Sequence, residues 1–175
     1  MKRILLTGLS GTGKSSVISE LAARGYKAID ADSDEWSEWA PYVAIPDLPE
    51  ANEPELEWIW RADRIRDLLV TDDADLLFVS GCTSNMSQFY GEFDHIVLLS
   101  APVQVIVERL SARTNNPYGK RPDELARVLG HVETVEPLLR RRATVEIDTS
   151  VPLDEVLASI LRLIENPEYC RAREL

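Results

Sequence analysis

A glycine-rich turn near the start of the chain has the composition and spacing of a phosphate-binding site. The stretch GLSGTGKSS at residues 8–16 satisfies the pattern G-x-x-x-x-G-K-[ST]. Because glycines carry no Cβ, the backbone can turn its N–H groups inward around an anion, and the dipole of a following helix adds positive charge. Lys14 adds a full charge for the β- and γ-phosphates, and the Ser15 hydroxyl is placed to bind Mg²⁺. The residues predicted to hold a nucleoside triphosphate are Gly8, Ser10, Gly11, Thr12, Gly13, Lys14, Ser15 and Ser16.

Three aspartates at alternate positions follow the second apolar run of the chain. In the stretch AIDADSDEW they are Asp30, Asp32 and Asp34. A strand that ends there could direct two of the three carboxylates at the point where the phosphates bind. Such carboxylates can hold the waters of a magnesium ion or accept the proton of an attacking hydroxyl group. The alternative is a solvated turn in which Asp32 or Ser33 caps the next helix.

A third apolar run leads into the loop SGCTSN, residues 80–85. Gly81 allows the backbone to approach a ligand closely, and the side chains of residues 83–85 are neutral hydrogen-bonding groups. This composition suits a polar, uncharged acceptor. A plain surface loop is the alternative interpretation.

The stretch ELEWIWRADRIRDLLV, residues 55–70, is predicted to be a helix. Its buried stripe is expected to contain Trp58, Ala62, Ile65 and Leu69. Glu57, Arg61 and Arg64 would share another face at the spacing of helical ion pairs. Two interpretations remain open: a solvated ladder of ion pairs, or an arginine clamp for an anionic group of a second substrate.

A basic segment follows the helix that is predicted over residues 103–112. Residues 113–122 are rich in Asn, Pro and Gly, and they include Arg113, Lys120 and Arg121. This composition predicts a mobile lid that would carry positive charge over a bound triphosphate. A charged surface loop is the alternative.

Apolar runs typical of strands alternate with helical patterns along the chain. The runs lie at 4–6, 26–29, 76–79, 96–99 and 145–147, and the later helical patterns lie at 103–112, 122–140 and 153–164. This alternation predicts an α/β fold, in which right-handed βαβ units build a five-stranded parallel sheet with helices on both faces. Ligands of such sheets bind at the carboxyl ends of the strands. The residues that follow each strand are therefore the expected functional residues.

Composition narrows the expected partners and location. The chain has 175 residues, 45% of them hydrophobic, and a net charge of −11, which fits one globular domain. Because Lys and Arg dominate affinity for nucleic acids, this acidic balance argues against a nucleic-acid partner. Apolar runs are too short for a secretory signal or a membrane span, so we expect a cytoplasmic protein with no membrane partner. Cys82 and Cys170 are expected to be reduced thiols.

These motifs resemble those of the small P-loop metabolite kinases, most closely shikimate kinase and gluconate kinase. The stretch LAARGYKAIDAD is similar to the second strand of shikimate kinase with its Asp-x-Asp. That resemblance implies that Asp32 binds the acceptor hydroxyl and that Asp30 lies near Mg²⁺. The stretch WRADRIRDLL resembles the helix that carries the carboxylate-binding arginine, which implies this role for Arg61.

Later stretches extend the resemblance over nearly the whole chain. The motifs SGCTSN and ERLSAR are similar to gluconate kinase, which implies that Arg109 packs on adenine and that Arg113 belongs to the lid. The stretch VEPLLRRRATVEIDTS is similar to the last helix and strand of shikimate kinase. The resemblance then places Asp148, Thr149 and Pro152 at the adenine pocket.

The resemblance implies a three-layer P-loop kinase fold in one domain, residues 1–175. It implies a substrate-binding insertion at about 33–70, a lid at about 113–122, the cofactors ATP and Mg²⁺, a small-molecule hydroxyl acceptor, and a monomer or homodimer. The expected catalytic residues are Lys14, Asp32, Arg113 and Arg121. The expected acceptor contacts are Asp32, Asp34, Arg61, Arg64, Gly81 and Cys82, and the expected metal ligands are Ser15 and Asp30.

Two other functions remain open. One is a nucleoside monophosphate kinase, in which Arg61, Arg64 and Arg66 would bind the acceptor phosphate. The other is a regulatory module that binds a nucleotide and has no acceptor. A GTPase switch would need the guanine-reading Asn-Lys-x-Asp, which the sequence lacks.

Shikimate itself is expected to be a poor substrate. Shikimate kinases hold the carboxylate with two arginines, and Val135 stands where the second would be. Leu139 stands where those enzymes have a tyrosine. Of the consecutive glycines that follow their third strand, only Gly81 is present. Loss of one charged hydrogen bond costs about 1.5 to 3 kcal/mol, or roughly ten- to a hundredfold in kcat/KM. Steady-state kinetics test this prediction, and a kcat/KM for shikimate above about 10⁴ M⁻¹s⁻¹ would contradict it.

Overall fold

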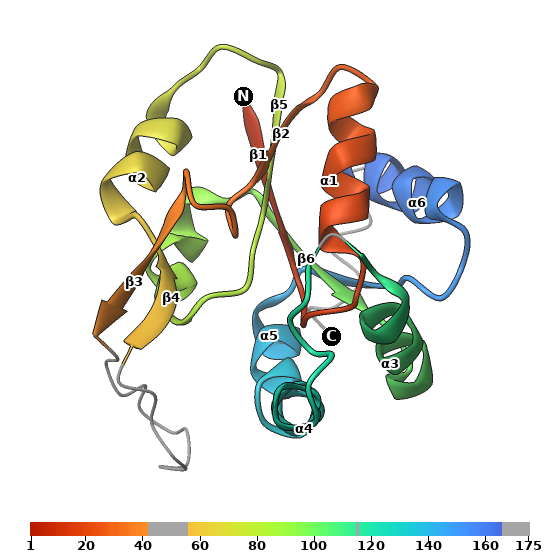
Figure 1. Cartoon of the computed structure of the whole chain (residues 1–175). Helices are drawn as coiled ribbons and strands as arrows, with labels where there is room; N and C mark the ends of the chain where they lie inside the picture. The colour runs from red at the N-terminus through yellow and green to blue at the C-terminus, as the bar shows by residue number, and fades with distance from the viewer. Residues whose placement is uncertain (42–55, 115, 166–175) are drawn as a thin grey trace.

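The computed structural model describes residues 1–41, 56–114 and 116–165, and within these ranges the chain builds a three-layer α/β fold (Figure 1). Five parallel strands form the central sheet in the order β2-β5-β1-β6-β7. They are β1 (Lys2–Thr7), β2 (Lys27–Asp30), β5 (Leu76–Ser80), β6 (His95–Ser100) and β7 (Val145–Asp148). The order reverses at β1, so the turn after this strand opens into the crevice where ligands of such sheets bind.

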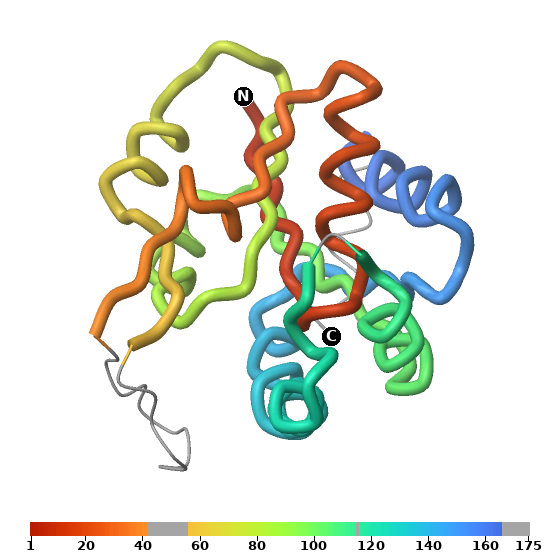
Figure 2. The backbone as a smooth tube through the Cα atoms, viewed as in Figure 1, coloured from red at the N-terminus to blue at the C-terminus, as the bar shows by residue number. Residues whose placement is uncertain are grey.

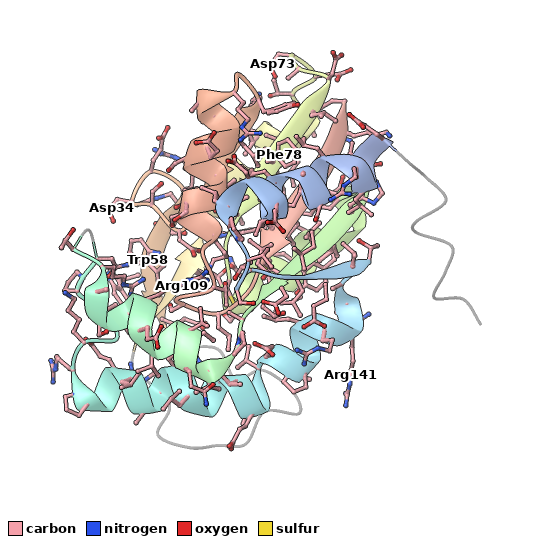
Figure 3. All side chains as sticks on the ribbon, turned by 90° about the vertical axis from the view of Figure 1, so that its right-hand side faces the viewer. Asp34, Trp58, Asp73, Phe78, Arg109 and Arg141 are labelled. Atoms are coloured by element: carbon pink, nitrogen blue, oxygen red, sulfur yellow. The ribbon has the colours of Figure 1, made fainter. Side chains whose placement is uncertain are left out.

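Two apolar layers cover the sheet. On one face pack α1 (Lys14–Ala23) and α6 (Leu153–Glu165), and there Phe78 is wholly buried (Figure 3). On the other face pack α2 (Ala62–Val70), the 3₁₀ segment η1 (Ser84–Glu92) and α5 (Glu136–Arg142). Burial on both faces is the reason that strands such as β1 are continuous apolar runs.

A smaller cluster joins α3 (Val103–Ala112) to α4 (Pro122–Thr134). Ile106 and Leu110 of α3 pack there against Val128 of α4. The cluster fixes both ends of the segment that connects these two helices.

The structure confirms the predicted sheet and most of the predicted helices. All five apolar runs form strands, and the patterns at 103–112 and 153–164 form α3 and α6; Asn166 and Pro167 lie outside the described residues. The prediction of one helix over 122–140 is wrong, because α4 ends at Thr134 and α5 begins at Glu136. Pro137 lacks the N–H that a continuous helix would need, so a new helix starts there.

The helix predicted over 55–70 is also wrong in its first part. Residues Leu56–Trp60 form strand β4, which pairs antiparallel with β3 (Ser37–Pro41), and α2 begins only at Ala62. The aromatic and β-branched side chains of this stretch favour a strand once a partner is present, and Trp58 pairs with Trp39 across the hairpin. Because Glu57 lies in the strand, the helical ladder with Arg61 and Arg64 does not form.

The β3–β4 hairpin lies beside α2 at the edge of the molecule (Figure 1). Residues 42–55 lie outside the described residues, as does that part of the predicted insertion. Asn85 of η1 fastens β4 to the body of the protein: its Oδ1 accepts a hydrogen bond from the Trp60 N–H at 3.0 Å, and its Nδ2 donates one to the Trp60 carbonyl at 2.8 Å. Trp60 is 1% exposed, so both backbone groups depend on this amide.

None of the helices in the described parts of the chain is long and apolar enough to cross a membrane. Of the two cysteines, Cys82 is a free thiol, and Cys170 lies outside the described residues.

Asn85→Ala is expected to destabilise the fold through this anchor. It leaves the buried N–H and carbonyl of Trp60 unpaired, which costs roughly 1 to 3 kcal/mol for each group. Denaturant unfolding followed by Trp fluorescence measures the loss. The matched control is Gln88→Ala in the same segment, because Gln88 is exposed and substitutions at such sites change stability by about 0.5 kcal/mol or less. Equal stabilities of the two variants would contradict the proposed anchor.

Candidate functional site

The predicted phosphate-binding loop connects β1 to α1 and lies against β6. Gly8, Gly11 and Gly13 have φ values of 147°, 89° and 93°, a region that favours glycine. A Cβ at Gly8 would lie 2.2 Å from the Leu99 carbonyl oxygen, so only glycine permits this contact. The Thr12 hydroxyl donates to the Leu9 carbonyl at 2.9 Å and closes the turn. The loop therefore presents its backbone N–H groups at the N-terminus of α1, as the sequence pattern predicts.

Lys14 folds back over this loop. Its Nζ donates to the Gly8 carbonyl at 2.8 Å and to the Leu9 carbonyl at 3.3 Å, and it lies 4.0 Å from Oδ2 of Asp32. The Lys14 side chain is 10% exposed. Its charge thus stands between the phosphate-binding backbone and the carboxylate that was predicted to meet the acceptor.

Ser15 and Asp30, the two predicted metal ligands, lie in contact with each other. The Ser15 hydroxyl donates to Oδ2 of Asp30 at 2.8 Å, while the Ser80 hydroxyl donates to Oδ1 at 3.1 Å. A hydroxyl and one carboxylate are the hard oxygen ligands that Mg²⁺ uses in proteins when phosphates and waters supply the rest. The described residues contain no cluster of three or more His, Cys, Asp or Glu side chains suited to a metal. These contacts fit a magnesium ion that arrives with a nucleotide.

Asp32 follows β2 in a tight turn. Its Oδ1 accepts the Cys82 N–H at 3.3 Å. A Cβ at Gly81 would lie 2.9 Å from this oxygen and 2.7 Å from the indole nitrogen of Trp60, so glycine leaves room for both. Burial raises the pKa of the Asp32 carboxyl, which Lys14 opposes and nearby Asp30 reinforces. Two of the three alternate aspartates thus meet at the phosphate loop, whereas Asp34 is exposed (Figure 3).

A pocket of about 840 Å³ opens beside this loop. The predicted residues that line it are Ser10, Gly11, Thr12, Gly13, Lys14, Ser15, Ser16, Asp30, Asp32, Arg109, Arg113 and Thr149. The residues that line it without having been predicted are Val17, Ser19, Ser33, Ala112, Asn116, Val151, Leu153 and Val156. Ser19 was detectable in the sequence, because it follows Ser15 by four residues on one face of α1. Two of the others belong to the region that was predicted to meet adenine, since Val151 lies within residues 148–152 and Leu153 directly follows them.

Arg109 is held at one end of this pocket. Its Nη2 donates to the Thr149 carbonyl at 2.5 Å and its Nη1 to the Thr149 hydroxyl at 3.0 Å. Thr149 also donates to the Thr12 carbonyl at 2.9 Å, which ties this arginine to the phosphate loop. The flat guanidinium near the apolar side chains of Val151 and Leu153 suits a planar base. Asp148 and Pro152 do not line the pocket.

The segment between α3 and α4 passes beside the phosphate loop (Figure 2). Arg113 donates from Nη2 to the Tyr118 carbonyl, and its Nε is buried without a hydrogen-bond partner. Burial lowers the pKa of Arg113, so this cation stands in a partly desolvated position. Arg121 instead caps α4, pairs with Asp123 at 3.2 Å and does not line the pocket; Lys120 is also exposed.

The remaining predicted acceptor residues have partners within the protein. Nη1 of Arg61 pairs with Oε2 of Glu38 at 2.7 Å, and Nη1 of Arg64 donates to the Glu35 carbonyl at 2.6 Å. Gly81 and Cys82 lie behind Asp32 and do not line the pocket.

The neutral side chains after β5 do not stand free for a ligand. The Ser84 hydroxyl donates to Oε2 of Glu57 at 2.6 Å, the Thr83 hydroxyl donates to Oδ1 of Asn85 at 3.0 Å, and Asn85 holds β4. This loop therefore fixes the hairpin in place.

A protein-family model described as an AAA domain matches residues 4–130, which include the phosphate-binding loop and most of the pocket. The chain belongs to this AAA-domain family. A search of curated proteins gives no match to the sequence.

Solved structures of small-molecule kinases share the fold of this AAA-domain protein. The shikimate kinase from Acinetobacter baumannii in complex with shikimate has a TM-score of 0.63 at 17% identity, covering 94% of this chain and 93% of that chain. A gluconokinase from Sinorhizobium meliloti 1021 has a TM-score of 0.53 at 23% identity over 96% of both chains. A sugar kinase from Janibacter sp. HTCC2649, unliganded, has a TM-score of 0.54 at 18% identity over 97% of this chain and 98% of that chain. The expected resemblance and the expected P-loop kinase fold are therefore confirmed.

Lys14→Ala is expected to remove activity and leave the fold nearly intact. A positive charge at a helix N-terminus gains nothing from the helix dipole, and the variant loses only the bonds of Lys14 to the Gly8 and Leu9 carbonyls. The thermal midpoint without ligand should therefore fall modestly. Loss of one charge-stabilising donor lowers turnover by about 10² or more. Calorimetry and an ATP-consumption assay measure the two effects. Lys27→Met, which breaks a surface ion pair with Asp73, is the matched control and should alter neither value strongly. If Lys14→Ala kept a turnover near that of the wild type, the proposed role of the loop in the reaction would be contradicted.

Proposed function

We propose that this AAA-domain protein is an ATP-dependent phosphotransferase that moves the γ-phosphate of ATP to a hydroxyl group of a small molecule. The observation that carries the proposal is the position of Asp32, whose Oδ2 lies 4.0 Å from Nζ of Lys14. A protein that only bound a nucleotide would not need a carboxylate that faces the phosphate-binding lysine. Such a group is suited to an attacking hydroxyl.

Each residue of the site has a definable task in this reaction. The backbone N–H groups of the loop bind phosphate oxygens, and Lys14 neutralises the charge that they carry. Asp32 orients the acceptor hydroxyl and takes its proton. Its raised pKa makes it a stronger base than an ordinary aspartate, and a base is more effective as its pKa approaches the working pH. Arg113, with a buried and unpaired Nε beside the pocket, is placed to meet charge on the transferred group.

Ser15 and Asp30 would hold a magnesium ion, which supplies neutralisation of phosphate charge when it is bound. On the other side of the pocket, Arg109 and the apolar pair Val151 and Leu153 would hold the base of ATP. Use of ATP as the donor also supports the proposed cytoplasmic location.

The geometry favours this function over a nucleoside monophosphate kinase. Such an enzyme would direct several arginines at the acceptor phosphate. Here Arg61 pairs with Glu38, Arg64 bonds a backbone carbonyl, and Arg66 bonds Gln88 and lies over the Phe89 ring. None of these three arginines lines the pocket.

The proposal is tested with a metabolite extract. The protein is incubated with ATP, Mg²⁺ and the extract, and mass spectrometry searches for a product heavier by one phosphate. A kinase releases ADP in proportion to that product. Nucleotide binding without acceptor-dependent turnover would instead support a regulatory module.

Asp32→Asn is expected to lower kcat by roughly 10² to 10⁴ while the affinity for ATP and Mg²⁺ persists, because the amide cannot take a proton. Turnover and nucleotide titration measure the two quantities separately. Asp67→Asn, which changes an exposed carboxylate of α2, is the matched control. If the variant lost nucleotide affinity and kept kcat, the proposed roles would be reversed: Asp32 would bind the metal and Asp30 would act as the base.

The pH profile of the wild type gives a second readout of the same residue. Because the pKa of Asp32 is raised, kcat/KM should fall on the acid side at a pH above the ordinary carboxyl value, as the base becomes protonated. The residual activity of Asp32→Asn should lack this acid limb. If Asp32→Asn showed the same fall in kcat/KM at acid pH, that fall would have to come from the titration of another group.

A further inference from the structure

We propose that the acceptor carries no acidic group and is a neutral or amine-bearing polyol or sugar. This inference rests on the proposed kinase function and names the substrate class of the same site. The arginine clamp considered from the sequence would instead imply an anionic acceptor. Three features of the turn and hairpin around Asp32 support it.

The first feature is that the arginine expected to grip an acid is bound within the protein. Nη1 of Arg61 lies 2.7 Å from Oε2 of Glu38, and its Nε donates to the Ser37 carbonyl at 3.2 Å. The backbone N–H of Arg61 donates to the Trp36 carbonyl at 2.7 Å, which fixes this residue at the start of α2. Since Glu38 both neutralises and orients the guanidinium, an acidic acceptor would have to displace a carboxylate already in place.

The second feature is the balance of charge on the turn and hairpin that carry Asp32. The cation nearest to this carboxylate, Nζ of Lys14 at 4.0 Å, belongs to the phosphate loop and also bonds the loop carbonyls. Residues 32–41 and 56–64 contain two basic side chains, Arg61 and Arg64. The same ranges contain six acidic side chains, namely Asp32, Asp34, Glu35, Glu38, Glu57 and Asp63. An acidic compound would approach Asp32 against like charge, whereas a neutral or amine-bearing one would not.

The third feature is an aromatic surface that adjoins Asp32. Nε1 of Trp58 donates to the Asp32 carbonyl at 3.2 Å, which holds this indole against the turn. The ring of Trp39 packs on it edge-to-face with centroids 5.2 Å apart, and Trp39 is 65% exposed. Tryptophan surfaces bind the apolar faces of ligands and attract cations. Both properties suit a sugar ring or an amine.

Matched acceptors test the inference with ATP and Mg²⁺. Glucose, glucosamine and glucuronate present one ring with a neutral, a basic or an acidic group, and myo-inositol, gluconate and shikimate widen the panel. We expect the acid-free compounds to be preferred by at least about tenfold in kcat/KM, the scale of one charged hydrogen bond. A product from the metabolite extract whose acceptor bears no carboxylate or phosphate would agree.

Glu38→Gln tests the stated cause. Without the carboxylate, Arg61 is released, and the kcat/KM for acidic members should rise by roughly ten- to a hundredfold relative to neutral members. Glu35→Gln is the matched control, since it removes the same charge from the same turn and leaves the Arg61 pair intact. A second substitution, Arg61→Met, added to Glu38→Gln should cancel the gain. Circular dichroism and the thermal midpoint check that each variant is folded.

The outcomes separate the inference from the proposed function. Phosphorylation of an acid in preference to its neutral counterpart would overturn the inference and leave the kinase function standing. A folded Glu38→Gln variant with unchanged discrimination would overturn it as well. Absence of any phosphorylated product, from the panel or from the extract, while ATP binds would overturn the kinase function itself.

Discussion

The close approach of Gly8 to β6 is the contact on which the rest of the site depends. A side chain at this position would collide with the Leu99 carbonyl, whose oxygen lies 2.2 Å from the site of a Cβ. Because the loop can lie so close to the sheet, Lys14 reaches back to the carbonyls of Gly8 and Leu9. The phosphate-binding backbone, the lysine and the start of α1 are thereby set in one place, and every other functional group is placed relative to them.

Two hydrogen-bond networks connect this loop to the carboxyl ends of the strands on either side. On one side, Asp30 at the end of β2 accepts from Ser15 of α1 and from Ser80 of β5. On the other side, Thr149 beyond β7 bonds the Thr12 carbonyl and Arg109. In the proposed binding mode, the first network would hold the metal and the second would hold the base, so the two ends of one nucleotide would lie toward two different edges of the sheet. A parallel sheet makes this arrangement possible because all its strands end on the same side.

The proposed acceptor side is built by different means. It consists of a turn, a two-stranded hairpin and the start of α2, which Asn85 and Ser84 tie to the body of the fold. This AAA-domain protein shares its overall fold with solved structures of a shikimate kinase and a gluconokinase. In this part of the chain, however, polar side chains form hydrogen bonds and ion pairs with each other. The Arg61 and Glu38 pair is the clearest example.

The sequence by itself determined the glycine-rich loop and the five strands. The loop depends on local spacing along the chain, and the strands depend on apolar runs that any compact fold must bury. Only the tertiary structure decided the conformation of residues 56–60 and the partners of the arginines. The pattern at 55–70 satisfies a helix, but residues 56–60 form a strand because β3 and Asn85 offer partners that are distant in sequence. The sequence left open whether Arg61 forms an ion pair or a clamp for an acid, and β3 brings Oε2 of Glu38 to 2.7 Å from its Nη1. Spacing along the chain predicts which groups can act, whereas contacts between distant segments decide which of them remain available.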